Sequence, residues 1–275
     1  MLVSIIMPAY NSEKTIKFSI SSVLNQTYAE WQLIVCDDGS TDETKFVVNE
    51  FAKNDHRIRI VDNAHTKGPA GARNCAISHA DGEVLAFLDS DDLWHTEKLE
   101  RHMKSLKLEH INFTYSDYLC FKNQNYLPLY KISAPDVVNE ARMKRGNPFG
   151  CLTVMIKNNR TTAKLFPEFS PKLNFFYRLL NLNVGHEDYQ AWLFYLRNIN
   201  FEGCLKIKGD LAMYRISSGS VSNNKFRSAI WHWLIFRNIF NLSFLSSLNS
   251  FRHYIFSASS RKKVEFDFDK IDFLR

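Results

Sequence analysis

The sequence lacks the patterns that indicate secretion or disulfide bonding. Its five cysteines are widely separated and contain no CxxC pair, which argues against both a disulfide framework and a zinc site. Met1 leads directly into a short apolar run that ends at Pro8, with no basic segment and too few apolar residues for a signal peptide. We therefore expect the protein to act in a reducing cytoplasm.

Two nucleotide-binding motifs are also missing. No GxGxxG sequence follows the first apolar run, and GxxxxGK followed by Ser or Thr occurs nowhere in the chain. Both motifs depend on glycines that let the backbone approach phosphate groups. Their absence disfavours a dinucleotide-binding site of the Rossmann type and a P-loop.

Acidic residues are absent from one long region. Between Leu211 and Val264 there are eight basic residues and no Asp or Glu, which exceeds the formal net charge of +6 for the whole chain. The positive charge is therefore local. A local patch of one sign indicates a partner at that place, and we do not expect nucleic acid as a partner.

Much of this basic region, from Lys225 to Lys263, has aromatic and aliphatic residues at helical spacing. No stretch of 18 residues is free of charged or strongly polar groups, so no membrane span is expected. Apolar faces with only positive charges are typical of helices that lie on an anionic membrane surface. The alternative is that these helices pack on the rest of the chain. Phe266 to Phe273 is compatible with an edge strand or a loose tail.

Short apolar strands and helices alternate over the first 95 or so residues. Ser40, followed by Glu43 three residues later, fits a capping box at the start of one helix. Strands are predicted at Val3–Met7, Gln32–Cys36, Arg57–Val61 and Val84–Leu88. This alternation predicts an α/β fold, with a mostly parallel sheet and helices on both faces. Ligands bind such sheets beyond the carboxyl ends of the strands.

Polar residues gather at these strand ends. Three carboxylates lie within four positions, at Asp89, Asp91 and Asp92, and they repel one another unless a cation is present. The pattern favours a hard divalent metal. The alternative is that Asp91 or Asp92 caps a helix that starts near Trp94. A helix opening near Pro69 would present backbone N–H groups and Arg73 to a phosphate.

Four motifs on successive strand–helix units resemble family 2 glycosyltransferases with the GT-A fold. They are Ser4–Asn11, Asp37–Asp42, Gly71–Asn74 and Asp89–Asp92. The resemblance covers about the first 105 residues and implies that residues 1–105 bind a nucleoside-diphosphate sugar, usually a UDP-sugar. It also implies roles for single residues: Pro8, Ala9 and Tyr10 line the base pocket, Asp38 accepts a hydrogen bond from uracil, and Arg73 lies near the ribose or pyrophosphate.

The same resemblance gives the acidic cluster its roles. It makes Asp91 the direct ligand of Mn²⁺ or Mg²⁺ and places Asp89 on the ribose or in the water shell of the metal. Asp92 would face the sugar, and Ser90 belongs to the same nucleotide-sugar-binding segment. A metal that bridges two phosphates stabilises the negative charge that develops as the glycosidic bond breaks.

Residues 106–222 are predicted to bind the acceptor and carry the catalytic base. Glu187-Asp188 precedes a helix, where two acids would stabilise the first turn without any further role. The resemblance instead matches Asp188 to the family's general base, with Glu187 positioning it or the acceptor. A general base that takes the proton of the attacking hydroxyl contributes about 10²–10⁴-fold to the rate.

The strands expected in this half include Cys151–Ile156, Phe201–Ile207 and Leu211–Ile216. The stretch from Tyr214 to Ser222 resembles a family segment in which a Tyr-Arg pair precedes a histidine. Ser217 stands where many members have that histidine, so the metal or phosphate contact that the histidine would make is not expected here. Arg215 remains a predicted ligand of the nucleotide-sugar.

The resemblance implies an inverting transferase that moves one hexose or N-acetylhexosamine from a UDP-sugar to a lipid-linked or oligosaccharide acceptor. The layout resembles bacterial enzymes of O-antigen, capsule or lipooligosaccharide synthesis, and residues 223–275 would hold the protein at the cytoplasmic face of the inner membrane. A processive polymer synthase is disfavoured because the chain has neither membrane spans nor a QxxRW motif.

Two other classes of protein remain as alternatives. A sugar nucleotidyltransferase needs a glycine-rich loop with Arg or Lys after its first strand, and Pro8–Ser12 has neither feature. A non-catalytic module that binds a nucleotide-sugar or a membrane would keep Asp38 and Asp91 but would not need Asp188.

Overall fold

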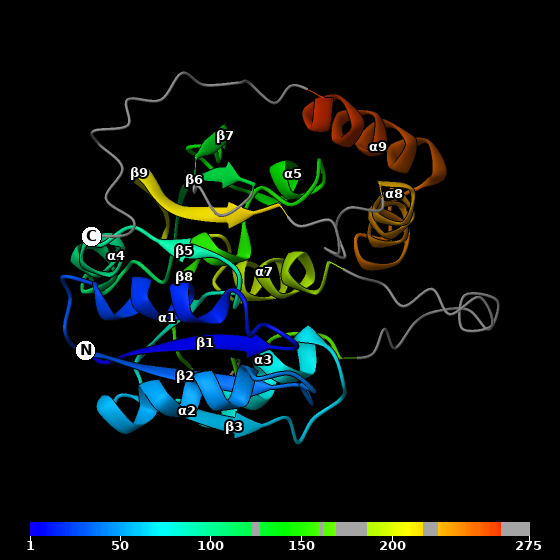
Figure 1. The fold of residues 1–275 in the computed structure, drawn as a ribbon. Coiled ribbons are helices and arrows are strands. Elements are labelled where there is room, and N and C mark those ends of the chain that lie inside the picture. The colour runs from blue at the N-terminus through cyan, green and yellow to red at the C-terminus, as the bar shows by residue number, and fades with distance from the viewer. Residues whose placement is uncertain (123–126, 160–161, 169–185, 217–224, 260–275) are drawn as a thin grey trace.

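The computed structural model describes residues 1–122, 127–159, 162–168, 186–216 and 225–259. Within these ranges nine strands form one sheet, in the order β3-β2-β1-β4-β8-β6-β9-β5, with β7 beside β6 (Figure 1). Helices cover both faces of this sheet. The predicted α/β class is therefore confirmed. Ser217–Ser222 and Phe266–Phe273 lie outside the described residues, so the expectations for them stay predictions.

The first half of the chain forms four parallel strands of the sheet. Its strands are β1 (Val3–Ala9), β2 (Trp31–Asp37), β3 (Ile58–Asp62) and β4 (Val84–Phe87), all parallel to their neighbours among these four. Its helices are α1 (Ile16–Leu24), α2 (Thr44–Asn54) and α3 (Pro69–Ser78). The carboxyl ends of the four strands consequently meet at one edge.

The second half extends the sheet from β4. Its strands are β5 (Leu93–Trp94), β6 (Phe113–Phe121), β7 (Pro128–Ile132), β8 (Met155–Lys157) and β9 (Cys204–Arg215). Its helices are α4 (Lys98–Leu106), α5 (Glu140–Met143), η1 (Cys151–Thr153) and α7 (Glu187–Asn198). Because β5 pairs with β9, the acidic segment between β4 and β5 lies next to the end of β9.

Three local predictions are wrong. Ser40 does not cap α2, which begins at Thr44, because its hydroxyl instead accepts a hydrogen bond from the backbone N–H of Asn11 at 2.9 Å. Cys151–Thr153 is a 3₁₀ turn, and only the residues after it form β8. The two strands expected around Lys208-Gly209 are one strand, β9.

The single strand β9 accommodates Lys208 and Gly209 by a shift of register. Ser116 of β6 pairs with Ile207, whereas the next residue, Asp117, pairs with Asp210. Gly209 has a φ of 118°, which a residue with a side chain rarely adopts. The break that was expected between two strands is therefore a bulge inside one strand.

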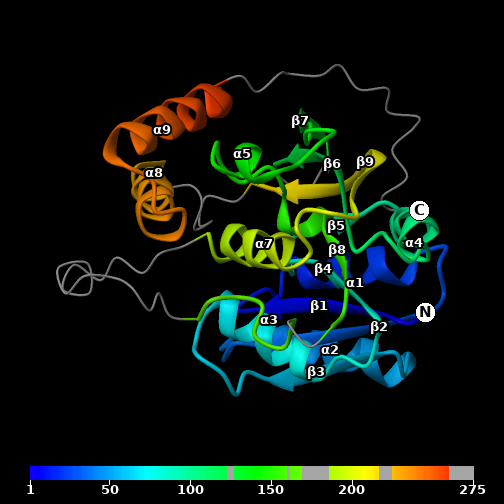
Figure 2. The same cartoon turned by 180° about the vertical axis from the view of Figure 1, so that it is seen from behind.

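Apolar residues form a layer on each face of the sheet, because successive residues of a buried strand point to opposite faces. Ile5 of β1 packs in the layer covered by α1, α2 and α4. Ile6 packs in the layer covered by α3 and α7, where the Phe87 ring lies 5.0 Å from the Trp192 ring. Figure 2 shows α7 and α3 on the near side of the sheet. This second layer holds α7 in place beside the carboxyl ends of the parallel strands.

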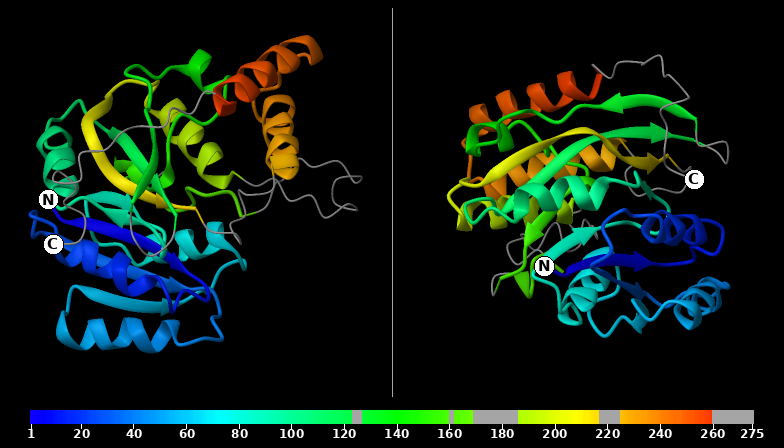
Figure 3. Two further views of the ribbon diagram at one scale, coloured as in Figure 1. Left: turned by 45° about the horizontal axis from the view of Figure 1, so that its top comes forward. Right: turned by 90° about the vertical axis from the view of Figure 1, so that its left-hand side faces the viewer.

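The C-terminal segment forms α8 (Lys225–Leu234), the π-helical turn η4 (Ile235–Ile239) and α9 (Phe244–Ser259). Ile235 and Phe236 are completely buried in the same apolar layer as α7. Both helices lie on the side of the molecule toward which β1 points (Figures 1 and 3). No helix in the described ranges is long and apolar enough to cross a membrane.

Candidate active site

Arg73 joins two acidic groups that are far apart in the sequence. Its guanidinium extends from α3, donates to Asp89 Oδ1 at 2.7 Å and to Glu187 Oε1 at 2.9 Å, and its side chain is only 6% exposed. Burial opposes the charge of Arg73, but Asp89 and Glu187 outweigh that cost and hold its pKa well above the ordinary value. Three segments therefore meet at one buried cation: α3, the loop after β4, and the start of α7.

The loop after β4 is fixed by hydrogen bonds on both sides. Ser90 Oγ lies 2.7 Å from Ser12 Oγ, and both side chains are buried. Asp92 Oδ1 accepts from the backbone N–H of Arg215 at 2.8 Å, while Arg215 Nε donates to the carbonyl oxygen of Asp91 at 2.8 Å. The end of β9 thus holds the acidic loop, and Asp92 is directed at backbone and is 1% exposed.

Asp91 has the properties of a cation ligand. Its side chain is partly exposed, and its backbone carbonyl oxygen is the atom that accepts from Arg215 Nε. Burial, with Asp89 as the second cause, raises its pKa to about 6. Asp92 is buried, and its Oδ2 has no hydrogen-bond partner among the described residues; burial, followed by the charge of Asp91, raises its pKa well above the ordinary value. A nearby cation would relieve this repulsion.

Asp91 and Asp89 would supply only part of the ligands of a metal ion. Across the part of the chain that the structure describes, no group of three or more His, Cys, Asp or Glu side chains is arranged to hold a metal. Mg²⁺ is commonly bound by one or two carboxylates together with substrate phosphates and water. Asp91 and Asp89 fit that kind of site, whose remaining ligands come from the substrate.

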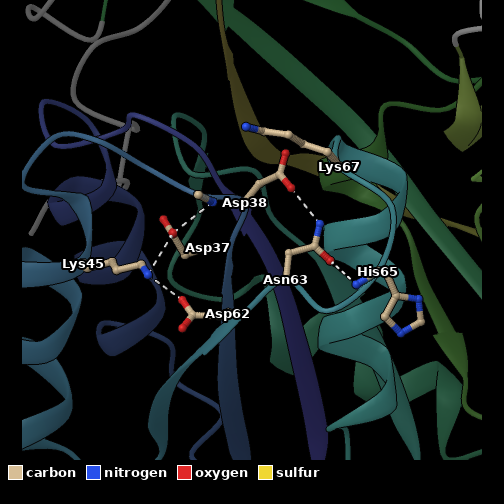
Figure 4. A pocket seen from close by; sticks show the side chains of 8 residues that line it. Asp37, Asp38, Lys45, Asp62, Asn63, His65 and Lys67 are labelled. Carbon is tan, nitrogen blue, oxygen red and sulfur yellow. Dashed lines mark hydrogen bonds and ion pairs between the residues drawn. The ribbon is translucent and has the colours of Figure 1, made fainter.

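A cavity of about 340 Å³ lies at the carboxyl ends of β2 and β3 (Figure 4). Asp38, predicted to contact uracil, lines it and accepts from Asn63 Nδ2 at 2.6 Å and from the backbone N–H of Gly68 at 2.8 Å. Lys45 Nζ lies 2.5 Å from Asp62 and 3.5 Å from Asp37. The cavity is lined by Asp37, Asp38, Gly39, Lys45, Asp62, Asn63, His65 and Lys67.

Pro8–Tyr10, the segment predicted to line the base pocket, lies beside this cavity and is not part of its lining. Pro8 and Ala9 are buried in β1, and Tyr10 is 52% exposed. Lys67, which lines the cavity, places its Nζ 5.5 Å from the centre of the Tyr10 ring. The sequence prediction missed Lys45, Asn63 and Lys67, although the position of the last two directly after the third strand was a usable signal.

Asp188 lies in the first turn of α7. Its Oδ2 accepts from Asn147 Nδ2 at 3.0 Å, and its Oδ1 accepts from the backbone N–H of Tyr189 at 2.8 Å. Burial, and then the charge of Glu187, raises its pKa to about 7, while Arg73 acts in the opposite direction. A carboxylate with a pKa near neutrality is suited to general base catalysis. Asn147 was not predicted from the sequence.

The carboxylate of Glu168 was also missed by the sequence prediction. It accepts from Asn74 Nδ2 at 2.9 Å, from His65 Nδ1 at 2.9 Å and from the backbone N–H of Thr66 at 3.2 Å. Burial raises its pKa, but these hydrogen bonds prevail and lower the pKa to about 2. Glu168 therefore ties the loop after β3, which lines the cavity, to the second half of the chain.

Comparison with known proteins identifies relatives for both halves of the chain. The model of the family described as "Glycosyl transferase family 2" matches residues 4–160. The chain is 41% identical over 234 residues to the UDP-Glc:alpha-D-GlcNAc-diphosphoundecaprenol beta-1,3-glucosyltransferase WfgD of Escherichia coli, covering 84% of each chain. It is 32% identical over 266 residues to the putative teichuronic acid biosynthesis glycosyltransferase TuaG of Bacillus subtilis, covering 95% of this chain and 97% of TuaG.

Two solved structures share the fold. TarS residues 1–349 from S. aureus align with a TM-score of 0.61 at 23% identity, covering 94% of this chain and 73% of that one. The chain spans 44% of a longer TarS chain. The mannosyltransferase PcManGT from Pyrobaculum calidifontis, solved with GDP-Man and Mn²⁺, aligns with a TM-score of 0.60 at 19% identity, covering 95% and 76%. Both are GT-A glycosyltransferases, in agreement with the arrangement of strands described above.

We predict that replacing Arg73 destabilises the fold far more than replacing a surface arginine. Arg73→Met leaves Asp89 and Glu187 without their shared partner, so the free energy of unfolding should fall by roughly 3–5 kcal/mol in chemical denaturation. Arg101→Met is the matched control, because Arg101 pairs with Glu97 on an exposed helix face and should change stability by less than about 1 kcal/mol. Equal losses in the two variants would contradict the role given to Arg73.

Proposed function

The chain belongs to glycosyl transferase family 2, and from this premise we propose that it transfers one sugar, with inversion, from a UDP-sugar to a lipid-linked acceptor. The product would serve the synthesis of a bacterial surface polysaccharide. The main support is the position of Arg73, which holds Asp89 and Glu187 together. Asp89, proposed for the donor side, and Glu187, which precedes the proposed base Asp188, are thereby neighbours in one site.

UDP-glucose is the donor that we propose first. The relatives WfgD and WfaP, which are 41% and 37% identical to this chain, are both named as glucosyltransferases that use UDP-Glc and GlcNAc-diphosphoundecaprenol. Asp38 would accept from the uracil ring beside Asn63, since a carboxylate has about four acceptor positions and two are in use. Pro8, Ala9 and Tyr10 would contact the base from β1.

We propose that Asp91, with Asp89 beside it, holds Mn²⁺ or Mg²⁺. Such a cation, when bound, stabilises the negative charge of the departing diphosphate. Arg73 would act from α3 by orienting Asp89, and Arg215 adds a second fixed positive charge next to Asp91. Ser90 and Asp92 would keep this loop in shape for the donor, through their bonds to Ser12 and to the end of β9.

Asp188 is the proposed general base. Asn147 and the Tyr189 N–H hold its carboxylate, and the ion pair of Glu187 with Arg73 fixes the adjoining residue. Asp188 takes the proton of the acceptor hydroxyl while that oxygen attacks the anomeric carbon and the bond to UDP breaks. The β linkage in the names of WfgD and WfaP supports inversion, because UDP-glucose carries its sugar in the α configuration.

The division of labour along the chain follows from these roles. We propose that residues 1–105 bind the donor, residues 106–222 bind the acceptor and supply the base, and residues 223–275 attach the protein to a membrane. One sheet runs through the first two parts, so they are functional regions within a continuous fold. The acceptor would reach Asp188 from the side of the molecule on which α8 and α9 lie.

A panel of UDP-sugars tests the proposal. With GlcNAc-diphospholipid as acceptor, we expect release of UDP from UDP-glucose that depends on Mn²⁺ or Mg²⁺ and on the acceptor. Asp188→Asn should lower kcat by at least about 10²-fold, because the amide cannot take the proton, and should leave the affinity for UDP-glucose nearly unchanged in calorimetry. Consumption of a nucleoside triphosphate in place of UDP release, or full activity of Asp188→Asn, would contradict the proposal.

The pH dependence of kcat should show the state of Asp188. Its pKa of about 7 means that the base is protonated and inactive at lower pH, so kcat should fall about tenfold per pH unit below pH 7 at saturating metal. Asn147→Ala removes a donor that favours the charged form, and should move this acid limb to higher pH. If the acid limb of the kcat profile lay at the same pH in the wild type and in Asn147→Ala, the role of Asp188 would be contradicted.

The C-terminal helices offer a surface for membrane attachment. Phe226, Phe244, Leu245, Leu248 and Ile255 are exposed, each between 43% and 78%, in the region that contains no acidic residue. We propose that this face rests on the anionic cytoplasmic surface of the inner membrane. Basic and apolar groups together bind such surfaces by charge attraction and by burial of the apolar part.

Sedimentation with lipid vesicles tests the attachment. Leu245→Ser combined with Leu248→Ser should weaken binding to phosphatidylglycerol vesicles by about tenfold or more, because two apolar side chains no longer enter the interface. Phe46→Ser is the control, since Phe46 is 61% exposed on α2, far along the chain from the basic region. Binding that is unaffected by the double substitution, or no preference for anionic lipid, would count against membrane attachment through this face.

A further inference from the structure

The residue before the proposed catalytic pair has an unusual backbone conformation. His186 has φ 57° and ψ 46°, the left-handed region that a residue with a side chain rarely enters. It precedes Glu187 and Asp188 at the start of α7, and its carbonyl oxygen accepts from the N–H of Gln190 at 3.3 Å. Strained conformations of this kind persist only when the surroundings hold them.

Side chains of the C-terminal helices hold His186. Its Nε2 lies 2.9 Å from the hydroxyl of Ser228 on α8, and its ring lies 4.4 Å from the ring of His232, one turn further along that helix. The same Ser228 hydroxyl lies 3.2 Å from the hydroxyl of Tyr254 on α9. The Tyr254 ring stacks on His232 with centres 3.8 Å apart. One hydroxyl thus connects α7, α8 and α9.

Burial keeps this contact uncharged. It lowers the pKa of His232 to about 3, with His186 as the second cause, and it lowers the pKa of His186 against the opposing effect of Glu187. Both rings are therefore neutral near pH 7. Ser228 and His186 meet as a neutral hydrogen bond, whose strength depends on geometry and little on salt.

The same helices also lie near Asn147, whose side chain donates a hydrogen bond to Asp188. Asn147, which donates to Asp188, follows Gly146, and a methyl group on Gly146 would lie 3.7 Å from the Tyr254 ring. On the far side of Asp188, the Tyr189 ring lies 5.9 Å from that of His232. His186 and Tyr189, which flank Asp188, therefore lie against α8, and Gly146, next to Asn147, lies near Tyr254 of α9.

We propose that Ser228 and Tyr254 are positioning residues of the transfer reaction: they hold His186 in its left-handed conformation and support the Gly146–Asn147 loop, and so aim Asp188 at the acceptor hydroxyl. This inference rests on the proposed function. It gives the C-terminal helices a part in catalytic geometry that is separate from membrane attachment. Neither residue contacts the reacting atoms.

Steady-state kinetics on the full chain separates positioning from a general structural role. Ser228→Ala and Tyr254→Phe should each lower kcat by about tenfold while the KM for UDP-glucose changes by less than about twofold, because these hydroxyls bond to His186 and to each other. Ser228→Thr keeps the hydroxyl and should restore kcat. His253→Ala, an exposed neighbour of Tyr254 on α9, is the control and should behave like the wild type. Unchanged kcat in both variants, with the wild type active, would overturn the inference.

A double substitution gives a second, independent readout. Glycine adopts the left-handed conformation freely, so His186→Gly keeps the backbone and removes the bond to Ser228. Ser228→Ala should then have little further effect on kcat in the His186→Gly background, whereas independent, multiplying effects would show that the two residues do not act together.

Hydrogen exchange distinguishes failure of this inference from failure of the proposed function. Backbone amides of residues 187–190 should exchange faster in Ser228→Ala and Tyr254→Phe than in the wild type, measured without substrates. A wild type that transfers no sugar would overturn the proposed function. Unchanged exchange at these amides would overturn the positioning role, whatever the activity.

Discussion

A buried guanidinium is the interaction on which the site depends. Arg73 is shielded from water, and a cation in that position is stable only when acidic partners surround it. Asp89 arrives from the end of β4 and Glu187 from the start of α7, so the two halves of the chain must come together at this point. The nucleotide end, the acidic loop and the proposed base are arranged around that single constraint.

The C-terminal helices pack against the start of α7, which carries the proposed base. The turn η4 between them, with Ile235 and Phe236, belongs to the same apolar layer as α7, while the Ser228 hydroxyl lies within hydrogen-bond distance of both His186 and Tyr254. Their outer face carries exposed apolar side chains. The elements proposed to meet the membrane are therefore the elements that brace the proposed base. Packing and surface attachment, posed as alternatives by the sequence, concern different faces of one pair of helices.

The sequence predicted best what depends on local pattern. Four parallel strands followed from short apolar runs at regular spacing, and the motifs at their ends indicated the family that the comparisons confirm. Predictions failed where a distant group competed with a local one. The hydroxyl of Ser40 bonds to Asn11, 29 residues away, and does not cap its own helix. Lys208-Gly209, where a break between two strands was expected, is a bulge because both flanking segments pair with β6.

The contacts that build the site were beyond prediction for the same reason. Arg73 and Glu187 are 114 residues apart, and Asn147 and Asp188 are 41 apart, so no spacing rule links them. Only the packing of α7 on the sheet makes them neighbours. The residue types were visible in the sequence, but their partners were not.

The configuration of the product tests the account most directly. Transfer from UDP-glucose by a single displacement, with Asp188 as base, inverts the anomeric carbon. The anomeric proton of the newly added sugar, observed by NMR before any rearrangement, should show a β-glucoside. An α-glucoside formed by the wild-type protein would contradict the single displacement and, with it, the role assigned to Asp188.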